Sequence, residues 1–198
     1  MRSRQASALA HLPDVPGKVI DAGMGGGRLV EALDLAGWEV IGIDLSETMV
    51  GLARARVPGL ADSLLVAPVE RLPFADGAFD AVTALGVLEF TADVSVALGE
   101  LARVLRPGGD AVVSWPNFGS LYAVWRRGLV NPVGRALGRP VPPQARNRLD
   151  AEAFETRLRE AGLTPQATSL LGATGASLRP RLAPALAAQL VFAARKGP

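Results

Sequence analysis

Short uninterrupted runs of apolar residues alternate with amphipathic, helix-like stretches along most of the chain. The apolar runs fall at residues 19–22, 40–44, 64–66, 79–85, 111–115, 163–171 and 190–194. Helical spacing falls at residues 27–36, 46–56, 94–106 and 150–161, and Asp150 is the expected cap of the last of these helices. Pro107-Gly108-Gly109 predicts a sharp turn into the fifth strand. Strands that are apolar throughout are typical of a parallel sheet covered by helices on both faces. The pattern predicts an α/β fold, a doubly wound, mostly parallel seven-stranded sheet of the Rossmann-like kind.

A glycine-rich turn, Gly23 to Gly27, separates the first strand from the first helix, and Asp21 precedes it. Glycine is needed where the backbone takes positive φ or approaches a ligand, and the helix start offers unpaired N–H groups. Such a turn is typical of a nucleotide site, with a plain tight turn as the alternative. The dinucleotide fingerprint Gly-x-Gly-x-x-Gly, counted from Gly23, fails at Arg28.

A second candidate lies at the end of the second strand, where Asp44 follows the glycine turn by about 20 residues. A carboxylate there accepts hydrogen bonds from both ribose hydroxyls of an adenosine-containing ligand. The alternative role for Asp44 is a helix cap, but Ser46 already offers one.

Composition excludes several kinds of chemistry. The 198 residues include no cysteine and one histidine, so thiolate metal ligands, disulfides and a Ser/His/Asp set are not expected. The lack of cysteine fits a cytoplasmic location, and no apolar window approaches the roughly 18 residues of a spanning helix. Residues 1–98 contain 7 Lys/Arg against 13 Asp/Glu, and the remainder contains 14 against 6. This asymmetry favours an anionic partner for the second half.

Four segments, in order, resemble the class I S-adenosylmethionine-dependent methyltransferases that act on small molecules, of the methyltransferase-11-like kind. They are the glycine turn with Asp21, the acid Asp44 with Leu45, residues 70–82, and residues 100–109. The resemblance implies S-adenosylmethionine as cofactor, S-adenosylhomocysteine as product and a single domain over residues 1–198. It assigns cofactor contacts to Asp21, Gly23, Met24, Gly25, Asp44, Leu45, Val69 and Leu85.

The resemblance also implies what each contact does. Asp21 and the amides near Gly23 would hold the methionine portion, with the carbonyl of Leu85 as a further contact for its ammonium group. Leu45 would pack on the adenine. Where the family commonly has an acid for the adenine amino group, this chain has Pro68. Adenine recognition would then fall to the N–H of Val69 and apolar packing, helped by Glu70.

An in-line methyl displacement needs alignment and exclusion of water more than it needs an acid or a base. A base is required only when the acceptor must lose a proton. Glu89, after the fourth strand, is the candidate for a catalytic or other polar contact to the acceptor. A solvated acid, or a cap on the following helix, is the alternative. Many relatives carry a histidine at this place, and this chain does not.

Residues 116–149 are rich in arginine, glycine and proline and follow the fifth strand, at the edge where ligands of open α/β sheets bind. We predict a lid over a small-molecule acceptor that is acidic or partly hydrophobic, with Arg146 and Arg148 near the pocket mouth. An ordinary amphipathic helix and an interfacial helix with weak contact to anionic lipid are the alternatives.

Two other enzyme classes and one non-catalytic class compete with this function. A nicotinamide-dependent oxidoreductase is opposed by Arg28. A nucleic-acid methyltransferase is opposed by Leu85-Gly86-Val87-Leu88, which lacks the Asn/Asp-Pro-Pro-aromatic run of amino-methylating relatives, so no nucleic acid is expected. A non-catalytic S-adenosylmethionine-binding relative is suggested by Pro68. The sequence does not distinguish an oxygen, nitrogen or carbon acceptor.

Overall fold

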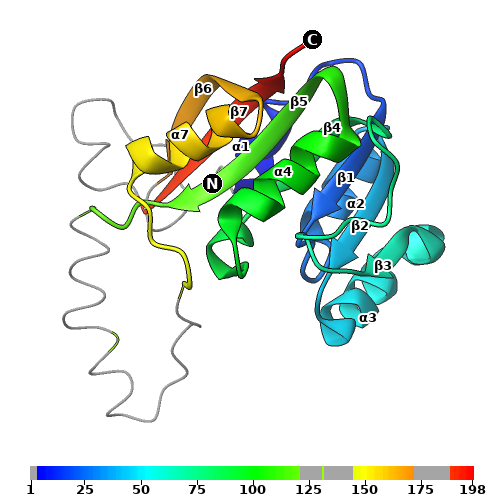
Figure 1. Cartoon of the computed structure of the whole chain (residues 1–198). Helices are drawn as coiled ribbons and strands as arrows, with labels where there is room; N and C mark the ends of the chain where they lie inside the picture. The colour runs from blue at the N-terminus through cyan, green and yellow to red at the C-terminus, as the bar shows by residue number, and fades with distance from the viewer. Residues whose placement is uncertain (1–3, 121–130, 132–144, 172–187) are drawn as a thin grey trace.

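The computed structural model describes residues 4–120, 131, 145–171 and 188–198. Its seven strands form one sheet in the order β3-β2-β1-β4-β5-β7-β6 (Figure 1). The strands are β1 (Lys18–Ala22), β2 (Glu39–Asp44), β3 (Leu64–Val66), β4 (Phe79–Ala84), β5 (Leu105–Pro116), β6 (Leu163–Leu171) and β7 (Gln189–Lys196). The first five run parallel and β7 runs antiparallel to both of its neighbours. The predicted mostly parallel, doubly wound sheet is confirmed.

Helices cover both faces of this sheet, as Figure 1 shows. They are α1 (Arg4–Leu9), α2 (Arg28–Leu35), α3 (Glu47–Arg56), α4 (Val94–Val104) and α7 (Ala151–Glu160), with short 3-10 helices η1 (Pro58–Ser63) and η2 (Leu88–Phe90). Helix α2 contacts both α1 and α3, and α4 contacts α7. Alternate strand residues serve the two faces: Val19 belongs to the core under α1, α2 and α3, and Ile20 to the core under α4 and α7.

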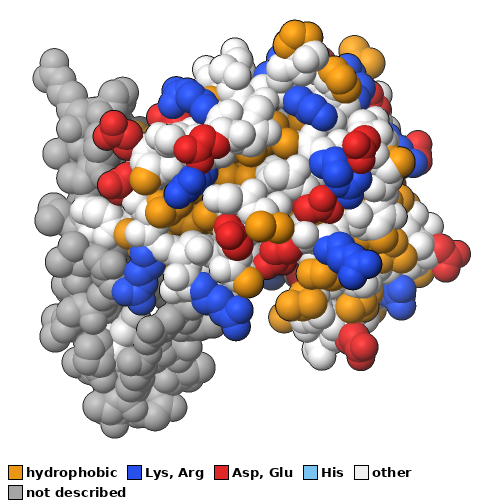
Figure 2. Space-filling model, in the orientation of Figure 1, with side chains coloured by type: hydrophobic (Ala, Val, Ile, Leu, Met, Phe, Trp, Pro, Cys, Tyr) orange, Lys and Arg blue, Asp and Glu red, His pale blue; other side chains and the backbone are white. Residues whose placement is uncertain are grey.

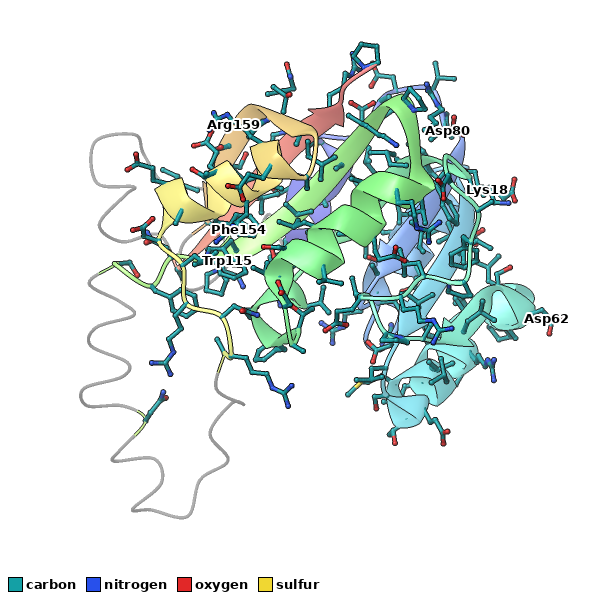
Figure 3. The ribbon with its side chains drawn as sticks, viewed as in Figure 1. Lys18, Asp62, Asp80, Trp115, Phe154 and Arg159 are labelled. Carbon is teal, nitrogen blue, oxygen red and sulfur yellow. The ribbon has the colours of Figure 1, made fainter. Side chains whose placement is uncertain are left out.

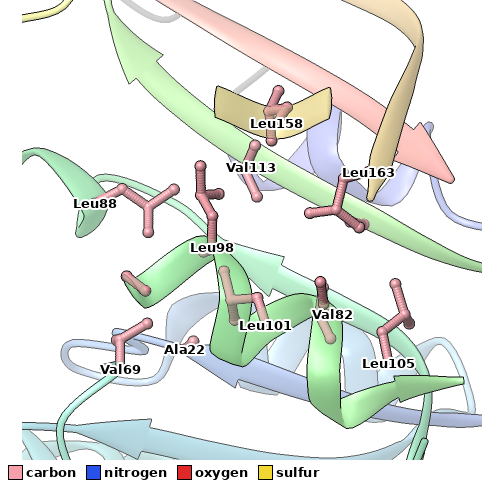
Figure 4. Packing of buried hydrophobic residues seen from close by; sticks show 14 of the residues in the cluster. Ala22, Val69, Val82, Leu88, Leu98, Leu101, Leu105, Val113, Leu158 and Leu163 are labelled. Carbon is pink, nitrogen blue, oxygen red and sulfur yellow. The ribbon is translucent and has the colours of Figure 1, made fainter. Parts of the chain in front are cut away.

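The core under α4 and α7 contains packed leucine and valine side chains such as Leu98, Val113 and Leu158 (Figure 4). It also contains the large buried rings of Trp115 and Phe154. Trp115, at the end of β5, stacks on Phe154 of α7 with ring centroids 4.3 Å apart, and Figure 3 shows the two side by side. The indole Nε1 of Trp115 donates to the carbonyl of Leu149 at 3.0 Å. The chain that returns to the sheet after residue 144 is therefore tied to the end of β5. Figure 2 shows acidic and basic side chains interspersed over the outside of this half.

The expected helix starts at Ser46 and Asp150 are confirmed, because Ser46 accepts from the Met49 N–H at 3.4 Å and Asp150 from the Ala153 N–H at 2.8 Å. The expected sharp turn at residues 107–109 is wrong. Helix α4 ends at Val104, and β5 begins at Leu105 and continues through the glycines with an irregular register against β4. A side chain at Gly109 would lie 2.9 Å from the Asp80 carbonyl, so glycine allows the strands to approach there.

Helix α1 was not expected from the sequence. It is six residues long, too short for a helical period to stand out, and it packs on α2 and β7. His11, just beyond it, hydrogen-bonds through Nε2 to the hydroxyl of Ser169 at 2.7 Å. The N-terminal segment therefore contacts β6, at the edge of the sheet, through His11, and contacts β7 and α2 through α1.

Candidate cofactor and acceptor site

A cavity of about 1180 Å³ opens at the carboxyl ends of β1, β2 and β4. Its described lining comes from the glycine turn, the starts of α2 and α3, the segment after β3, the segment after β4, helix α1 and the returning chain at Arg146. Ligands of open α/β sheets bind at this edge, on either side of the point where the strand order reverses. Here that point lies between β1 and β4, because β2 and β3 follow on one side of β1 and β4 on the other.

The glycine turn contains three residues with positive φ, at 74° for Gly23, 53° for Gly25 and 75° for Gly27. A Cβ on Gly23 would lie 2.5 Å from Val87 Cβ, and one on Gly27 would lie 2.9 Å from Ala53 Cβ. A Cβ on Gly25 would meet no atom within 4 Å. Gly23 and Gly27 therefore permit close packing, whereas Gly25 leaves the cavity open for a ligand.

The backbone of the turn is held by the second strand. The N–H groups of Gly23 and Met24 both donate to the carbonyl of Ile43, at 2.8 and 2.9 Å. The prediction that amides near Gly23 hold the methionine portion is therefore wrong for these two donors, since they already have an acceptor. Both residues line the cavity, but the Met24 side chain is 6% exposed and its sulfur packs towards Gly42 in the core.

Asp44 lies where the sequence places it, at the cavity edge after β2. Its Oδ2 accepts from the Gly25 N–H and its Oδ1 from the Ser46 N–H, both at 2.9 Å. A carboxylate offers about four acceptor positions, so two backbone bonds leave room for hydroxyl donors. Leu45 lines the cavity next to it and is 72% exposed, an unusual exposure for leucine that apolar contact with a ligand would reduce.

Asp21 is a buried acid in the floor of the cavity, only 2% exposed. Its Oδ1 accepts from the hydroxyl of Thr83 on β4 at 2.7 Å. Burial raises the pKa of Asp21 to about 7; the Thr83 hydrogen bond opposes this shift and the charge of Asp44 adds to it. The carboxyl of Asp21 therefore changes charge near neutral pH.

Pro68, Val69 and Glu70 line the cavity after β3, and Leu85 lines it after β4. Val69 is 5% exposed, so its side chain packs in the core beneath this wall. Glu70 Oε1 accepts from the Ala92 N–H at 2.8 Å and so connects this segment to the one that follows η2. The sequence places all of these residues at one cavity, and the structure brings them together.

Glu89 lies in η2 and is 5% exposed. It is neither solvated nor a helix cap, because Asp93 caps α4 by accepting from the Ser95 N–H at 2.7 Å. That alternative is wrong. Within the described residues, Glu89 Oε2 is buried without a hydrogen-bond partner. Burial raises the pKa of Glu89, and its own backbone N–H and the charge of Arg4 oppose that shift. Glu89 is not among the lining residues of the cavity, but Gly86, Phe90 and Thr91 on either side of it are.

The returning chain is fastened to η2. The N–H groups of Arg146 and Asn147 donate to the Glu89 carbonyl at 2.8 and 3.1 Å, and the Asn147 side-chain amide donates to the Thr91 carbonyl at 2.9 Å. Arg146 and Arg148 are both exposed, but only Arg146 is among the lining residues of the cavity, as expected for it. Residues 121–130 and 132–144 of the expected lid lie outside the described residues.

Sequence reasoning missed Arg4 and Gln5 of α1, which line the cavity, and the anchor Asn147. No motif identifies them, because their role depends on contacts between distant parts of the chain. Among the described residues, no group of three or more His, Cys, Asp or Glu side chains could hold a metal ion. Across the same residues, none of the helices is long and apolar enough to cross a membrane.

The sheet order, the open glycine turn and the acid after β2 define a Rossmann-like nucleotide-binding architecture. Residues 20–113, just under half of the chain, match the model of the methyltransferase domain family. The match confirms the resemblance drawn from the four sequence segments, and with it S-adenosylmethionine as the cofactor class.

Two curated relatives illustrate the family. The demethylmenaquinone methyltransferase of Thermus thermophilus is 41% identical over 136 residues, covering 63% of this chain and 61% of that protein. The malonyl-[acyl-carrier protein] O-methyltransferase of Erwinia pyrifoliae is 37% identical over 136 residues, covering 67% of this chain and 51% of that protein. The chain thus spans about half to three fifths of the length of these relatives.

Solved structures share the fold over nearly the whole chain. An S-adenosylmethionine-dependent methyltransferase from Mesorhizobium loti has a TM-score of 0.72 at 21% identity, with 96% of each chain covered. The 1,6-didemethyltoxoflavin-N1-methyltransferase of Burkholderia thailandensis, solved with S-adenosylhomocysteine bound, has a TM-score of 0.68 at 22% identity, covering 98% of this chain and 76% of that one. At these identities the likeness establishes the fold.

Proposed function

We propose that this chain transfers a methyl group from S-adenosylmethionine to a small-molecule acceptor. The observation that carries the proposal is the cavity where the glycine turn meets β2. There Gly25 is open to ligand, and Asp44 holds the Gly25 N–H while keeping free acceptor positions. S-adenosylmethionine supplies an activated methyl group on a sulfonium, so the protein must mainly orient the two reactants and exclude water.

In this proposal, different residues of the cavity contact different parts of the cofactor. Asp44 receives the ribose hydroxyls, and Leu45 covers one face of the adenine. The Val69 N–H donates to the edge of the adenine, because Pro68 occupies the position where the family commonly has an acid for the adenine amino group. Glu70 lies beside this contact. Gly23, Met24 and Gly25 form the floor under the methionine portion. Asp21 and the Leu85 carbonyl lie nearest to its ammonium group.

The acceptor side of the proposal is less specific. Glu89 makes the polar contact, and residues 116–149 act as the lid of a single domain over residues 1–198. Phe90, an exposed apolar side chain of η2 at the cavity, supports an acceptor that is partly hydrophobic. The basic second half of the chain supports an acidic one. The acceptor atom is open, since relatives are named for C-, O- and N1-methyl transfer.

The absence of cysteine in the 198 residues supports a cytoplasmic setting for this reaction. An interfacial contact with anionic lipid, through the basic and aromatic stretch after Pro116, would bring the protein to hydrophobic acceptors. Vesicle co-sedimentation with anionic and neutral lipids measures that contact directly.

Calorimetry with S-adenosylhomocysteine and with NADH tests the cofactor. Binding of the first and not the second is expected. NADH binding would favour the oxidoreductase alternative. Formation of S-adenosylhomocysteine in the presence of a small-molecule panel then tests catalysis. Tight cofactor binding without transfer to any acceptor would indicate a non-catalytic relative.

A further inference from the structure

We propose that Arg4 and Glu89 form an acceptor subsite beside Gly86, and that the acceptor is a weak acid which gives its proton to Glu89 as it is methylated. The inference rests on the proposed function and deepens it, because it names the chemical class of the acceptor. An O–H group, such as a phenol or enol, or a C–H group made acidic by a neighbouring carbonyl, belongs to that class.

The two charged groups converge on one glycine. Gly86 lines the cavity and has φ of 75°. The position that its Cβ would take lies 2.5 Å from Arg4 Nη1 and 4.0 Å from Glu89 Oε1. Arg4 itself lines the cavity, whereas Glu89, in η2, is not among the lining residues. Because Gly86 has no side chain, the guanidinium of Arg4 fits against the chain at this point.

Glu89 is a buried acid that lacks a partner. It is 5% exposed, and among the described residues its Oε2 accepts no hydrogen bond. A carboxylate buried in this way costs stability unless something pairs with it, so an unsatisfied one requires an explanation. The charge of Arg4 acts on the Glu89 carboxyl. An acceptor hydroxyl or acidic C–H bound beside Gly86 would approach Oε1, the Glu89 oxygen nearer to Gly86, and supply a donor to this carboxyl.

The position of Glu89 is also fixed. Its backbone carbonyl accepts from the Arg146 and Asn147 N–H groups at 2.8 and 3.1 Å. The Thr91 hydroxyl, two residues on, donates to the Leu88 carbonyl at 2.8 Å. The segment that carries the acid is therefore held by the returning chain on one side and by its own turn on the other, as a proton acceptor in a catalytic site requires.

The Arg4 cation and the Glu89 base, placed side by side, favour a weakly acidic methyl acceptor over an amine. The guanidinium of Arg4 is always charged, so it repels an ammonium group and stabilises an anion that forms beside it. Burial raises the pKa of Glu89 towards the range in which a carboxylate is an effective base at neutral pH. An amine acceptor, which must already be unprotonated to react, needs neither group.

The reaction balances as follows. The Glu89 carboxylate takes the proton from the acceptor O–H or C–H. The electron pair left on that atom attacks the methyl carbon of S-adenosylmethionine, and the methyl–sulfur bond breaks. Its electron pair remains on sulfur, which leaves as neutral S-adenosylhomocysteine. The proton stays on Glu89 until product release, and Arg4 stabilises the anion that exists before the methyl group is transferred.

The first test needs no acceptor. Carbon NMR of glutamate carboxyl groups, with the Glu89 signal assigned from Glu89→Gln, measures the Glu89 titration. We expect Arg4→Gln to move that titration to higher pH and the matched change at the exposed Arg148, Arg148→Gln, to leave it in place. An unchanged titration in Arg4→Gln would overturn the pairing of the two groups.

The second test uses phenols of graded acidity as probes, with matched anilines as controls. We expect transfer to the phenols, with kcat lowered about 10²- to 10⁴-fold in Glu89→Gln, the usual contribution of a general base. Arg4→Gln should lower transfer too, Arg4→Lys should recover part of the loss, and Arg148→Gln should have no effect. S-adenosylhomocysteine affinity should be unchanged in all of them.

Two kinds of failure are distinguishable in this design. If the wild-type protein does not bind S-adenosylhomocysteine, the proposed function fails. The cofactor site stands, and the acceptor class proposed here is wrong, if the wild-type protein binds S-adenosylhomocysteine but methylates only the anilines or neither series. The same conclusion follows if the Glu89→Gln variant methylates the phenols as well as the wild-type protein does.

Discussion

The two sides of the cavity are built in different ways. On the cofactor side, neighbouring strands supply the residues, and backbone hydrogen bonds fix them: Ile43 accepts from the glycine turn and Asp44 accepts from Gly25. On the acceptor side, α1, η2 and the returning chain come together from positions 4, 89 and 146. The first kind of site can be recognised from a short sequence motif, whereas the second exists only once the chain has folded.

The acids on the two sides differ in the same way. Asp44 and Asp21 have protein donors, two backbone N–H groups and the Thr83 hydroxyl respectively. Glu89 Oε2 is without a partner among the described residues. The cofactor side is therefore complete before ligand binds, and the acceptor side is not. Four substitutions test this contrast, in order of decreasing expected effect.

Gly25→Val should remove cofactor binding, by at least a thousandfold or about 4 kcal/mol. The side chain would point into the open cavity and would also strain a backbone with φ of 53°. Calorimetry with S-adenosylhomocysteine measures the loss. Gly51→Val is the matched control, because Gly51 is exposed in α3 and a Cβ there meets nothing within 4 Å. Normal binding by a folded Gly25→Val would make Gly25 a turn residue only.

Asp21→Asn should stabilise the protein more at high pH than at low pH. Burial raises the pKa of Asp21 to about 7 in the folded chain, from its ordinary value of 3.8. Between these values the folded state holds a proton that the unfolded state has lost, so wild-type stability falls as pH rises to about 7 and is level above it. Asparagine removes this dependence and can still accept from Thr83.

Urea unfolding of Asp21→Asn and of the wild-type protein at pH 5 and pH 8 tests the predicted direction of this pH dependence of stability. The difference in unfolding free energy should grow by about 3 kcal/mol in favour of the variant, because each pKa unit corresponds to about 1.4 kcal/mol. Asp62→Asn, an exposed acid in η1, should show no such change. A pH-independent difference for Asp21→Asn would mean that this carboxyl is ionised throughout.

Asp44→Ala should weaken S-adenosylhomocysteine binding by about 1.5 to 3 kcal/mol, the range for losing hydrogen bonds to a charged acceptor. Part of this loss comes from the glycine turn, because the Gly25 N–H loses its acceptor as well. Calorimetry on Asp44→Ala and on Asp62→Ala separates the site effect from a general change in charge. A dissociation constant that does not change would refute the ribose assignment.

The sequence predicts the cofactor side well because its signals are local. Apolar runs identified all seven strands, and the glycine turn and Asp44 lie at the cavity where they were expected. The hydrogen bonds from the Gly23 and Met24 N–H groups to the Ile43 carbonyl were not predictable, because they depend on how close the ends of β1 and β2 lie to each other. The predicted turn at Gly108 and Gly109 was wrong for a similar reason. These residues belong to β5, which pairs with β4 in an irregular register.

The acceptor side was only partly predictable. Glu89 was identified from its place after β4, but its burial depends on the returning chain that covers η2. Arg4 and Asn147 carry no local signal, since each acts on a segment more than 50 residues away in sequence. Arg146 and Arg148 look equivalent in the sequence and are both exposed, and only the fold shows that Arg146 lines the cavity and Arg148 does not.

That separation gives the last and smallest prediction. Arg146→Gln should raise the KM for an anionic acceptor by about twofold to fivefold, because an exposed charge pair contributes about 0.2 to 1 kcal/mol. Affinity for S-adenosylmethionine should stay within about twofold, or roughly 0.4 kcal/mol, since Arg146 is bonded to η2 on the acceptor side. Arg148→Gln should change neither constant. Steady-state kinetics with each substrate varied in turn distinguishes the outcomes, and an Arg146→Gln effect confined to the cofactor would move this arginine to the other side of the cavity.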